Sequence, residues 1–292
     1  MNNSLAMKQR SAAVRKRRRF SPAKLLSYLV MLLACFCIIF PILIVLFTSF
    51  KTDQEYVSST VFQLPQSFLN FENYVNAFTS GNFLRAFKNS AILVVTGALG
   101  NVALGSMSAY CLGRFDFKGR SMFRSLYVIS AAVPGATLQV SIYMLLKNMG
   151  LTGTMAAPIL LYISTDIVQV WIYLQYIETI SPSLDESAML DGASYFRIFV
   201  SIIFPLLMPA TATVLILKTV SIYNDMFIQY LYMMGDKMQT VSTALQTFAG
   251  VSTNLQNTLS AAIVIVMLPT VILFLALQKQ IFGGIVMGSV KG

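Results

Sequence analysis

The chain carries few of the side chains that catalyse reactions. Histidine, the usual general base and the commonest zinc ligand, is absent from its 292 residues. Its three cysteines, Cys35, Cys37 and Cys111, lie within apolar runs, where we expect packing residues rather than a disulfide frame or a metal site. No GxxxxGK[ST] phosphate-binding loop occurs. We therefore predict no catalytic residue, metal or cofactor on this chain, and any ATP that it uses must be bound elsewhere.

An acidic, glycine-broken segment at 181–204 stands out in this apolar chain. A helix is predicted to begin at Ser183, because Ser183 and Glu186 have the S-x-x-E spacing of a capping box. Gly192 is suited to end that helix in a left-handed conformation, and a second helix can begin at Ser194. Two short helices with a bend, an acidic start and an aromatic second half are suited to lie in a groove of another protein.

The elements that position this segment are membrane helices. Hydrophobic residues make up 56% of the chain and charged residues 11%, which is typical of an integral membrane protein. Continuous apolar runs exclude the alternating strands of a membrane β-barrel, and Pro205 fits the first turn of the fifth run. We predict an all-α protein whose six runs are each long enough to span a bilayer: 25–50, 89–112, 121–147, 155–178, 205–224 and 259–278.

The distribution of lysine and arginine predicts the orientation. Basic residues are concentrated in the arm at 1–24 and in the turn at 113–120, whereas the opposite side of the six spans holds few. By the positive-inside rule both termini are cytoplasmic. The formal charge of +10 therefore needs no nucleic-acid partner, and the basic arm is expected to contact anionic membrane lipid. The first apolar run is long enough to span, which argues against a cleaved signal peptide.

Two further segments have a predicted structure. The outer segment at 51–88 is expected to form a folded cap with a short amphipathic helix, because Phe71, Tyr74, Val75 and Phe78 recur at helical spacing. In the second span, small residues are predicted to permit close helix packing; they are Gly97, Gly100, Gly105 and Ala109.

The acidic segment resembles the EAA signature of permease subunits of binding-protein-dependent ABC importers. That signature reads E-A-A, three residues, G, nine residues, I, one residue, L-P. Ser187 and Phe204 depart from it, and both are compatible with a helix. The matching positions are Glu186, Ala188, Gly192, Ile202 and Pro205.

Three other runs are similar to those of carbohydrate permeases, and they occur in the expected order. SAYCLGRFDFKGR at 108–120 resembles the run after the second span, and YNDMFIQYLYM at 223–233 resembles WNDFxxPL with Tyr223 in place of tryptophan. FGGIVMGSVKG at 282–292 is similar to the tail of the maltose-type second permease subunit. The resemblance therefore covers nearly the whole chain.

This resemblance implies a type I ABC importer permease in a bacterial plasma membrane. The implied partners are a second permease subunit in a heterodimer, two ATPase subunits that hold ATP and Mg, an extracytoplasmic binding protein and a sugar. The implied division is a basic arm at 1–24, a permease domain at 25–278 and a cytoplasmic tail at 279–292. The residues implied to couple to the ATPase are Asp185, Glu186, Ala188, Asp191, Gly192, Phe196, Phe199 and Pro205, and those of the ATPase-contacting tail are Gly288, Ser289, Val290, Lys291 and Gly292.

Other candidate positions lie in the spans and in the last outer loop. Asp166 and Lys218 are charges deep within spans, which are costly there; they are predicted to pair, to line a cavity or to contact the partner permease. Polar and aromatic candidates for the sugar path are Gln139, Tyr143, Gln169, Trp171, Gln175 and Asn224. By position in the maltose-type subunit, candidates for a loop that enters the binding protein are Gly250, Ser252, Asn254, Gln256 and Asn257.

Two alternatives remain open at the level of sequence. The same machine can carry another solute, such as a polyamine or an amino acid, although the runs at 113–120 and 288–292 favour a sugar. An ion-coupled secondary transporter would show internal repeats and broken spans. No convincing repeat is visible, and the EAA match would have no role in such a protein.

Overall fold

A computed structural model describes residues 22–249 and 256–289, and within them the protein is entirely helical. Four helical segments are long and apolar enough to cross a membrane: Lys24–Ser49, Phe83–Arg114, Ala156–Thr179 and Gln256–Gln278. Two bent helix pairs raise that number to as many as six. The predicted all-α membrane architecture is therefore confirmed.

The third predicted span is two helices rather than one. Helix α6 (Arg120–Ala132) and helix α7 (Gly135–Asn148) meet at an angle of 104°. The break falls at Val133 and Pro134, because proline donates no backbone hydrogen bond and disfavours a helical conformation at the preceding residue. The predicted span over 121–147 is therefore not one continuous helix but a bent pair.

The fourth predicted span is also interrupted. Helix α8 (Ala156–Ile163) ends before an extended residue, Ser164, and helix α9 (Ile167–Thr179) begins after Asp166. The Asp166 side chain causes the restart, because its Oδ1 accepts a hydrogen bond from the backbone N–H of Gln169 at 3.0 Å. A charge predicted to lie along a continuous helix instead caps a helix inside the span.

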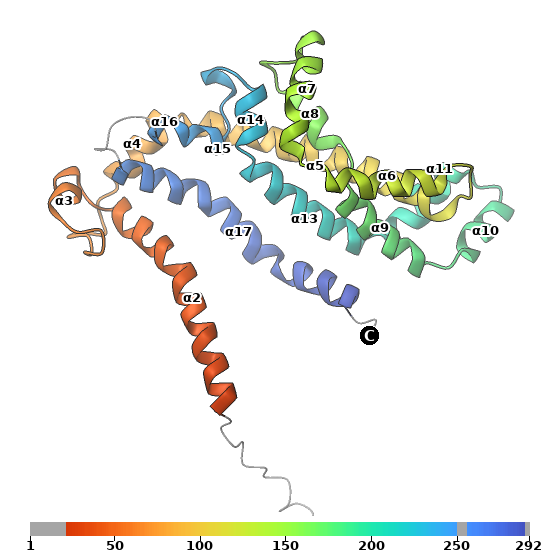
Figure 1. The fold of residues 1–292 in the computed structure, drawn as a ribbon, viewed down its shortest axis with the longest axis horizontal. Coiled ribbons are helices and arrows are strands. Elements are labelled where there is room, and N and C mark those ends of the chain that lie inside the picture. Colours follow the sequence, from red (N-terminus) through yellow and green to blue (C-terminus); the bar gives the residue numbers. More distant parts are fainter. Residues whose placement is uncertain (1–21, 250–255, 290–292) are drawn as a thin grey trace, which may run out of the picture.

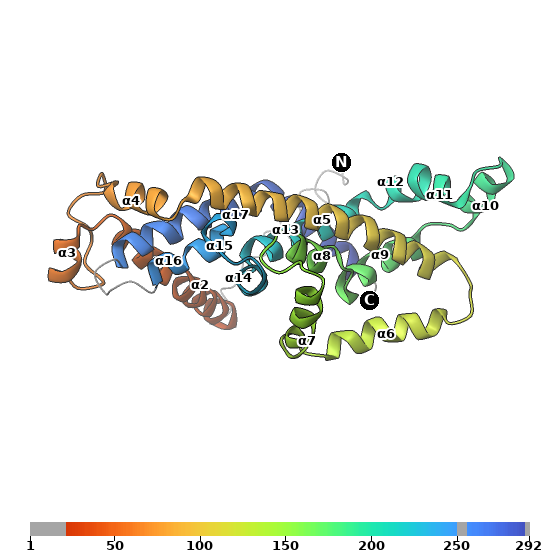
Figure 2. The same ribbon diagram turned by 90° about the horizontal axis from the view of Figure 1, so that it is seen from above.

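Helix α5 (Phe83–Arg114) is the central element, and it packs against α8, α9 and α13 (Met208–Asn224). The predicted small residues explain how closely it packs. A Cβ added at Gly97 would lie 2.8 Å from the Cβ of Tyr162, closer than real Cβ contacts come. The buried core lies along these contacts, and Figure 2 shows α5 running the length of the helical body.

The first and last spans form the other side of the molecule. Helix α2 (Pro22–Ser49) contacts α17 (Gln256–Ser289), and it points away from the body so that most of its apolar surface is exposed (Figure 1). Helix α17 runs past the predicted end of the span at 278. The first part of the predicted tail therefore continues the helix, and residues 290–292 lie outside the described part.

The predicted outer cap is present. It contains α3 (Asp53–Ser58) and α4 (Glu72–Ser80), and the latter is the expected short helix. Buried Lys51 holds the cap, since its Nζ donates to Ser59 Oγ and to the carbonyl oxygen of Thr60, both at 2.9 Å. Short helices between α13 and α17 complete this end: α14 (Phe227–Tyr232), the 3-10 turn Asp236–Met238, α15 (Val241–Ala244) and α16 (Gln246–Ala249).

Candidate functional site

The acidic segment forms a helical hairpin at one end of the molecule. Helix α10 (Ser183–Leu190) is followed by a bend, and α11 (Tyr195–Ile198) continues through a π-helical turn (Phe199–Ile203) into α12 (Phe204–Leu206). Gly192 lies at the bend with φ +78°, a conformation that favours glycine. Figure 2 shows this hairpin at the opposite end of the long axis from α3 and α4.

Two local predictions about the hairpin are corrected. Ser183 is the first helical residue and not the cap, because the helix begins one residue earlier than the capping-box spacing requires. Its Oγ lies 2.8 Å from Ser181 Oγ, and Pro182 occupies the cap position. Pro205 lies within α12, whereas the spanning helix α13 begins after a 78° bend and carries Pro209 in its first turn.

Asp185 points into the protein and not towards a partner. Its Oδ2 lies 3.1 Å from Arg114 Nε at the end of α5, and both side chains are only 11% exposed. Its Oδ1 accepts a hydrogen bond from Tyr110 Oη at 2.9 Å. Arg114 also donates to the carbonyl oxygen of Ile180 at 2.7 Å, so one residue binds both the start of α10 and the chain leading to it.

The remaining predicted coupling residues divide into two groups. Ala188 and Phe199 are buried, and the ring of Phe199 lies 5.4 Å from that of Tyr110. The outward group is Glu186, Asp191 and the aromatic side chain of Phe196, which is 67% exposed. Sequence reasoning missed Leu190, which is 89% exposed at the end of α10. The hairpin therefore presents apolar side chains beside carboxylates.

Sequence reasoning also missed the residues that hold the hairpin. Tyr110 and Arg114 belong to the run at 108–120, which was recognised only as a resemblance. A signal for their role exists in retrospect: a tyrosine and an arginine four residues apart occupy one face of a helix that ends in the basic turn. Their partner, however, lies 75 residues away from Tyr110.

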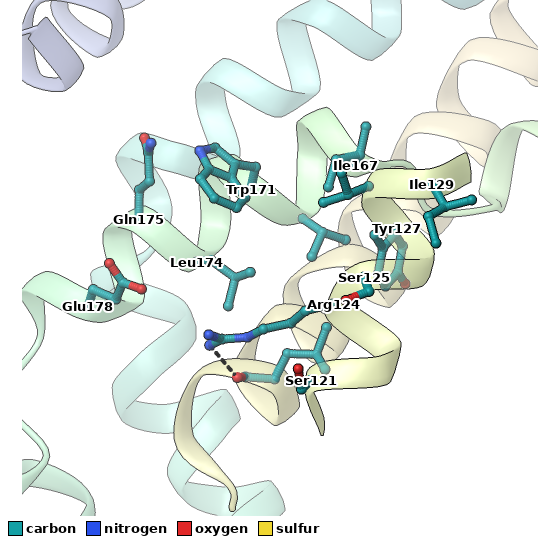
Figure 3. Close-up of a pocket in the computed structure, with 13 residues that line it drawn as sticks. Ser121, Arg124, Ser125, Tyr127, Ile129, Ile167, Trp171, Leu174, Gln175 and Glu178 are labelled. Carbon is teal, nitrogen blue, oxygen red and sulfur yellow. Dashed lines mark hydrogen bonds between the residues drawn. The ribbon is translucent and has the colours of Figure 1, made fainter. Parts of the chain in front are cut away.

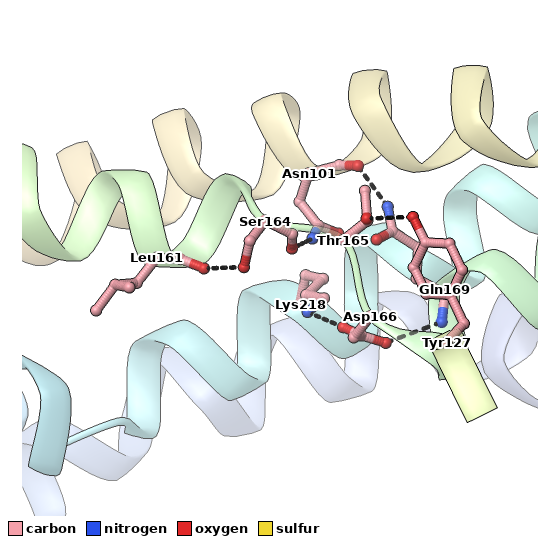
Figure 4. Close-up of polar contacts among 8 residues, drawn as sticks. All are labelled: Asn101, Tyr127, Leu161, Ser164, Thr165, Asp166, Gln169 and Lys218. Atoms are coloured by element: carbon pink, nitrogen blue, oxygen red, sulfur yellow. Dashed lines mark hydrogen bonds and ion pairs between the residues drawn. The ribbon is translucent and has the colours of Figure 1, made fainter. Parts of the chain in front are cut away.

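The two intramembrane charges are in contact. Lys218 Nζ of α13 forms an ion pair with Asp166 Oδ2 at the break between α8 and α9 (Figure 4). The break is held on its other side by Asn101 of α5, whose Nδ2 donates to the carbonyl oxygen of Ser164 at 2.7 Å. Gln169, predicted to line a sugar path, instead donates to the carbonyl oxygen of Asn101 and is 2% exposed. It is a packing residue.

The other predicted path residues lie in three places. Gln139 accepts a hydrogen bond at 2.9 Å from Tyr232 Oη, and Tyr143 packs on the same tyrosine ring. Burial raises the pKa of Tyr232, which keeps its hydroxyl a donor. Asn224 is exposed at the end of α13 and donates to the carbonyl oxygen of Val220.

Trp171 and Gln175 line a cavity of about 510 Å³ between α6 and α9 (Figure 3). The structure thus brings these two predicted path residues together. Among the described residues, the lining of this cavity does not include Gln139, Tyr143 or buried Gln169.

The predicted binding-protein loop is corrected in part. Gly250, Ser252 and Asn254 lie outside the described residues, and Gln256 is exposed at the first position of α17. Asn257 is fully buried, and its Nδ2 donates to the carbonyl oxygen of Lys51 at 3.1 Å and to Asp53 Oδ1 at 2.7 Å. Asn257 therefore fastens α17 to the outer cap.

The last five residues of the chain were predicted to contact an ATPase. Gly288 and Ser289 form the end of α17. Val290, Lys291 and Gly292 lie outside the described residues.

Comparison with known proteins identifies the family. Residues 101–285 match the model of the binding-protein-dependent transport system inner membrane component. The melibiose/raffinose/stachyose import permease protein MelC of Bacillus subtilis is 34% identical over 94% of this chain and 99% of its own. The trehalose/maltose transport system permease protein MalG of Thermococcus litoralis is 29% identical over 89% and 94%.

Solved structures show the same fold. A bacterial ABC transporter involved in the import of the acidic polysaccharide alginate has a chain that matches with a TM-score of 0.78 at 19% identity. The match covers 88% of this chain and 95% of that one. This chain belongs to the family of binding-protein-dependent transport system inner membrane components, the permease subunits of ABC importers.

Proposed function

We propose that this chain is the permease subunit of an ATP-driven importer that moves a sugar or oligosaccharide from an extracytoplasmic binding protein into the cytoplasm. Relatives that match nearly end to end support the substrate class, because their names specify melibiose, raffinose and stachyose, trehalose and maltose, and maltodextrin. None of these is a polyamine or an amino acid permease.

The hairpin is the proposed docking surface for an ATPase subunit. The observation that carries this proposal is the contrast between its two faces. Leu190 and Phe196 are exposed beside the carboxylates of Glu186 and Asp191, while Asp185, Ala188 and Phe199 bind the hairpin to its own chain. A large exposed apolar side chain rimmed by polar groups is typical of a protein interaction site.

The hairpin is suited to transmit a displacement. The Asp185 contacts with Tyr110 and Arg114 join it to the end of α5, and α5 packs against α8, α9 and α13. A movement of α10 imposed by ATP-driven closure of the ATPase pair would therefore reach the central helices as a rigid-body shift. ATP and Mg would be held by the ATPase, so this chain contributes no catalytic residue.

The proposed orientation puts the hairpin, the basic arm and both termini in the cytoplasm of a bacterial cell. Arg114, Arg120 and Arg124 support it, because they cluster beside the turn after α5 at the hairpin end, as the positive-inside rule requires. The cap formed by α3 and α4 lies at the opposite end, where it would face the binding protein. One solved structure with a similar fold is a bacterial alginate ABC transporter in complex with a periplasmic protein that carries an alginate pentasaccharide.

The assembly is proposed to contain a second, different permease subunit and two ATPase subunits. The exposed apolar surface of α2 supports a partner subunit within the membrane. Helix α2 packs mainly against α17, which leaves most of its apolar side chains uncovered. Lys291 and its neighbours in the tail at 288–292 are proposed to contact the ATPase, and 250–256 is proposed to contact the binding protein.

Uptake by the reconstituted importer tests this function. The full chain would be co-expressed with the products of the neighbouring transport genes and reconstituted in proteoliposomes. Uptake would be compared with and without ATP on the side of the membrane that carries the ATPase subunits. We expect ATP-dependent uptake of at least one of melibiose, raffinose, stachyose and maltotriose, and none of putrescine or glutamine. Uptake of putrescine or glutamine with no uptake of any sugar would overturn the substrate class.

A further inference from the structure

We propose that the cavity between α6 and α9 is a binding site for one phospholipid, phosphatidylethanolamine. The cavity has a volume of about 510 Å³, within the roughly 300–1,000 Å³ range of small-molecule sites. Two helical faces form its walls. Ser121, Arg124 and Val128 recur at one face of α6, and Trp171 and Glu178 lie on the facing stripe of α9.

The two ends of the cavity differ in polarity. Arg124 and Ser121 on α6 lie towards Gln175 and Glu178 on α9, while the opposite end is formed by Ile129, Ile167, Ser125 and the ring of Tyr127 (Figure 3). The hydroxyl of Tyr127 is 2.8 Å from Thr165 Oγ1, so this end is mainly apolar. The aliphatic side chains of the lining include Val128, Ile129, Ile167 and Val170. A polar end followed by an apolar groove matches a lipid headgroup and the start of its acyl chain.

The polar end carries one charge of each sign. Arg124 Nη2 donates to the carbonyl oxygen of Leu112 at 2.8 Å, and its buried Nε has no hydrogen-bond partner among the described residues. Among the side chains that the structure describes, those of 279–289 not being included, neither Arg124 nor Glu178 has an ion-pair partner. The guanidinium can therefore bind a phosphate and the carboxylate an ammonium group. Ethanolamine supplies that ammonium with three N–H donors, whereas choline has none.

A sugar fits the same cavity less well, although Trp171 and Gln175 are suitable sugar contacts. Sugar hydroxyls buried against Val128, Ile129 and Val170 would lose hydrogen bonds to water without replacement, which is costly. An acyl chain incurs no such cost. In the orientation proposed above, the polar end of the cavity lies at the cytoplasmic leaflet, where the headgroups are; the lipid site itself does not depend on which solute is transported.

Native mass spectrometry of the full chain with its partner subunits tests the proposal. The complex would be delipidated and then titrated with phosphatidylethanolamine or with phosphatidylcholine of the same acyl chains. We expect phosphatidylethanolamine to bind roughly tenfold more tightly, since the headgroup N–H bonds to Glu178 are charge-assisted. Equal affinity for the two lipids would overturn the proposal, as would binding of neither.

Variants separate the site from general lipid contact. Glu178→Gln should remove most of the preference for ethanolamine over choline. Val128→Trp should abolish binding by filling the cavity one helical turn along α6 from Arg124, whereas Val140→Trp, on exposed α7, should leave binding unchanged. Phosphatidylethanolamine retained by Val128→Trp at the wild-type affinity would also contradict the proposal. If sugar rather than lipid occupies the cavity, melibiose or maltotriose will compete with the lipid, and that result would overturn it too.

Discussion

Arg114, at the end of α5, and Asp185, in the first turn of α10, form a buried ion pair with 3.1 Å between Nε and Oδ2. The N–H of Arg114 is not aligned on that oxygen as a hydrogen bond, so the contact is chiefly electrostatic. Tyr110 completes it by donating to the other carboxylate oxygen. This pair connects the hairpin to the central helix.

Asp185→Ala should destabilise the protein. The substitution leaves Arg114 buried without its counter-charge, and breaking a buried pair in this way costs about 3–5 kcal/mol. Thermal unfolding of the purified chain in detergent would measure the loss as a lower Tm. The matched control is Asp116→Ala, whose exposed carboxylate also faces an arginine, and its Tm should equal that of the wild type. Equal Tm values for the wild type, Asp185→Ala and Asp116→Ala would show that the buried pair contributes nothing to stability.

Glu186→Ala should impair coupling to the ATPase without destabilising the fold. Its side chain is exposed beside Asp185, and no described residue forms an ion pair with it. We therefore expect an unchanged Tm together with weaker sugar-dependent stimulation of ATP hydrolysis in the assembled importer. An unchanged stimulation would exclude Glu186 from the docking surface, and a lowered Tm would assign it to the fold.

The ion pair between Asp166 and Lys218 predicts an asymmetric rescue. Lys218→Asp sets two carboxylates against each other within the membrane, and it should abolish transport or assembly. Adding Asp166→Lys restores the pair but removes the cap on Gln169, so the double variant should recover only part of the activity. Uptake measurements on the single and double variants check this, and a double variant no better than Lys218→Asp would refute the pairing.

Gly97→Ala tests the close packing of α5. The added methyl group would lie 2.8 Å from Tyr162 Cβ and 3.0 Å from Ile222 Cδ1, so the helices must separate. Overpacking of this kind costs about 1–3 kcal/mol, which thermal unfolding would detect. Gly135→Ala is the control, because a Cβ there meets no atom within 4 Å. A Tm for Gly97→Ala equal to that of Gly135→Ala would contradict the packing.

Much of this architecture follows from the sequence because its signals are local. Apolar length predicts the spans, glycine spacing predicts the close packing of α5, and Gly192 predicts the bend of the hairpin. The breaks at Pro134 and Asp166 were not anticipated, since both residues lie inside apolar runs of sufficient length. At Pro134 the geometry of proline interrupts the helix, and at Asp166 the side chain caps a new helix.

The division of the hairpin into two faces could not be predicted in the same way. Asp185 and Glu186 are adjacent carboxylates in sequence, and only the position of Arg114 and Tyr110 in space makes one structural and the other available. Likewise, Gln169 has the composition of a sugar contact, yet the approach of Asn101 buries it. Long-range packing settles such roles, and a single sequence contains no record of it.

The central claim is that the hairpin docks an ATPase through Leu190 and Phe196. The most direct measurement is the amount of ATPase subunit that co-purifies with the full chain carrying Leu190→Ala and Phe196→Ala together. Both side chains are exposed, so the Tm should not change, and loss of two apolar anchors should reduce recovery of the ATPase at least about tenfold. Val57→Ala, an exposed apolar residue on α3 at the other end, should retain it fully. Wild-type recovery of the ATPase by the double variant would contradict the account.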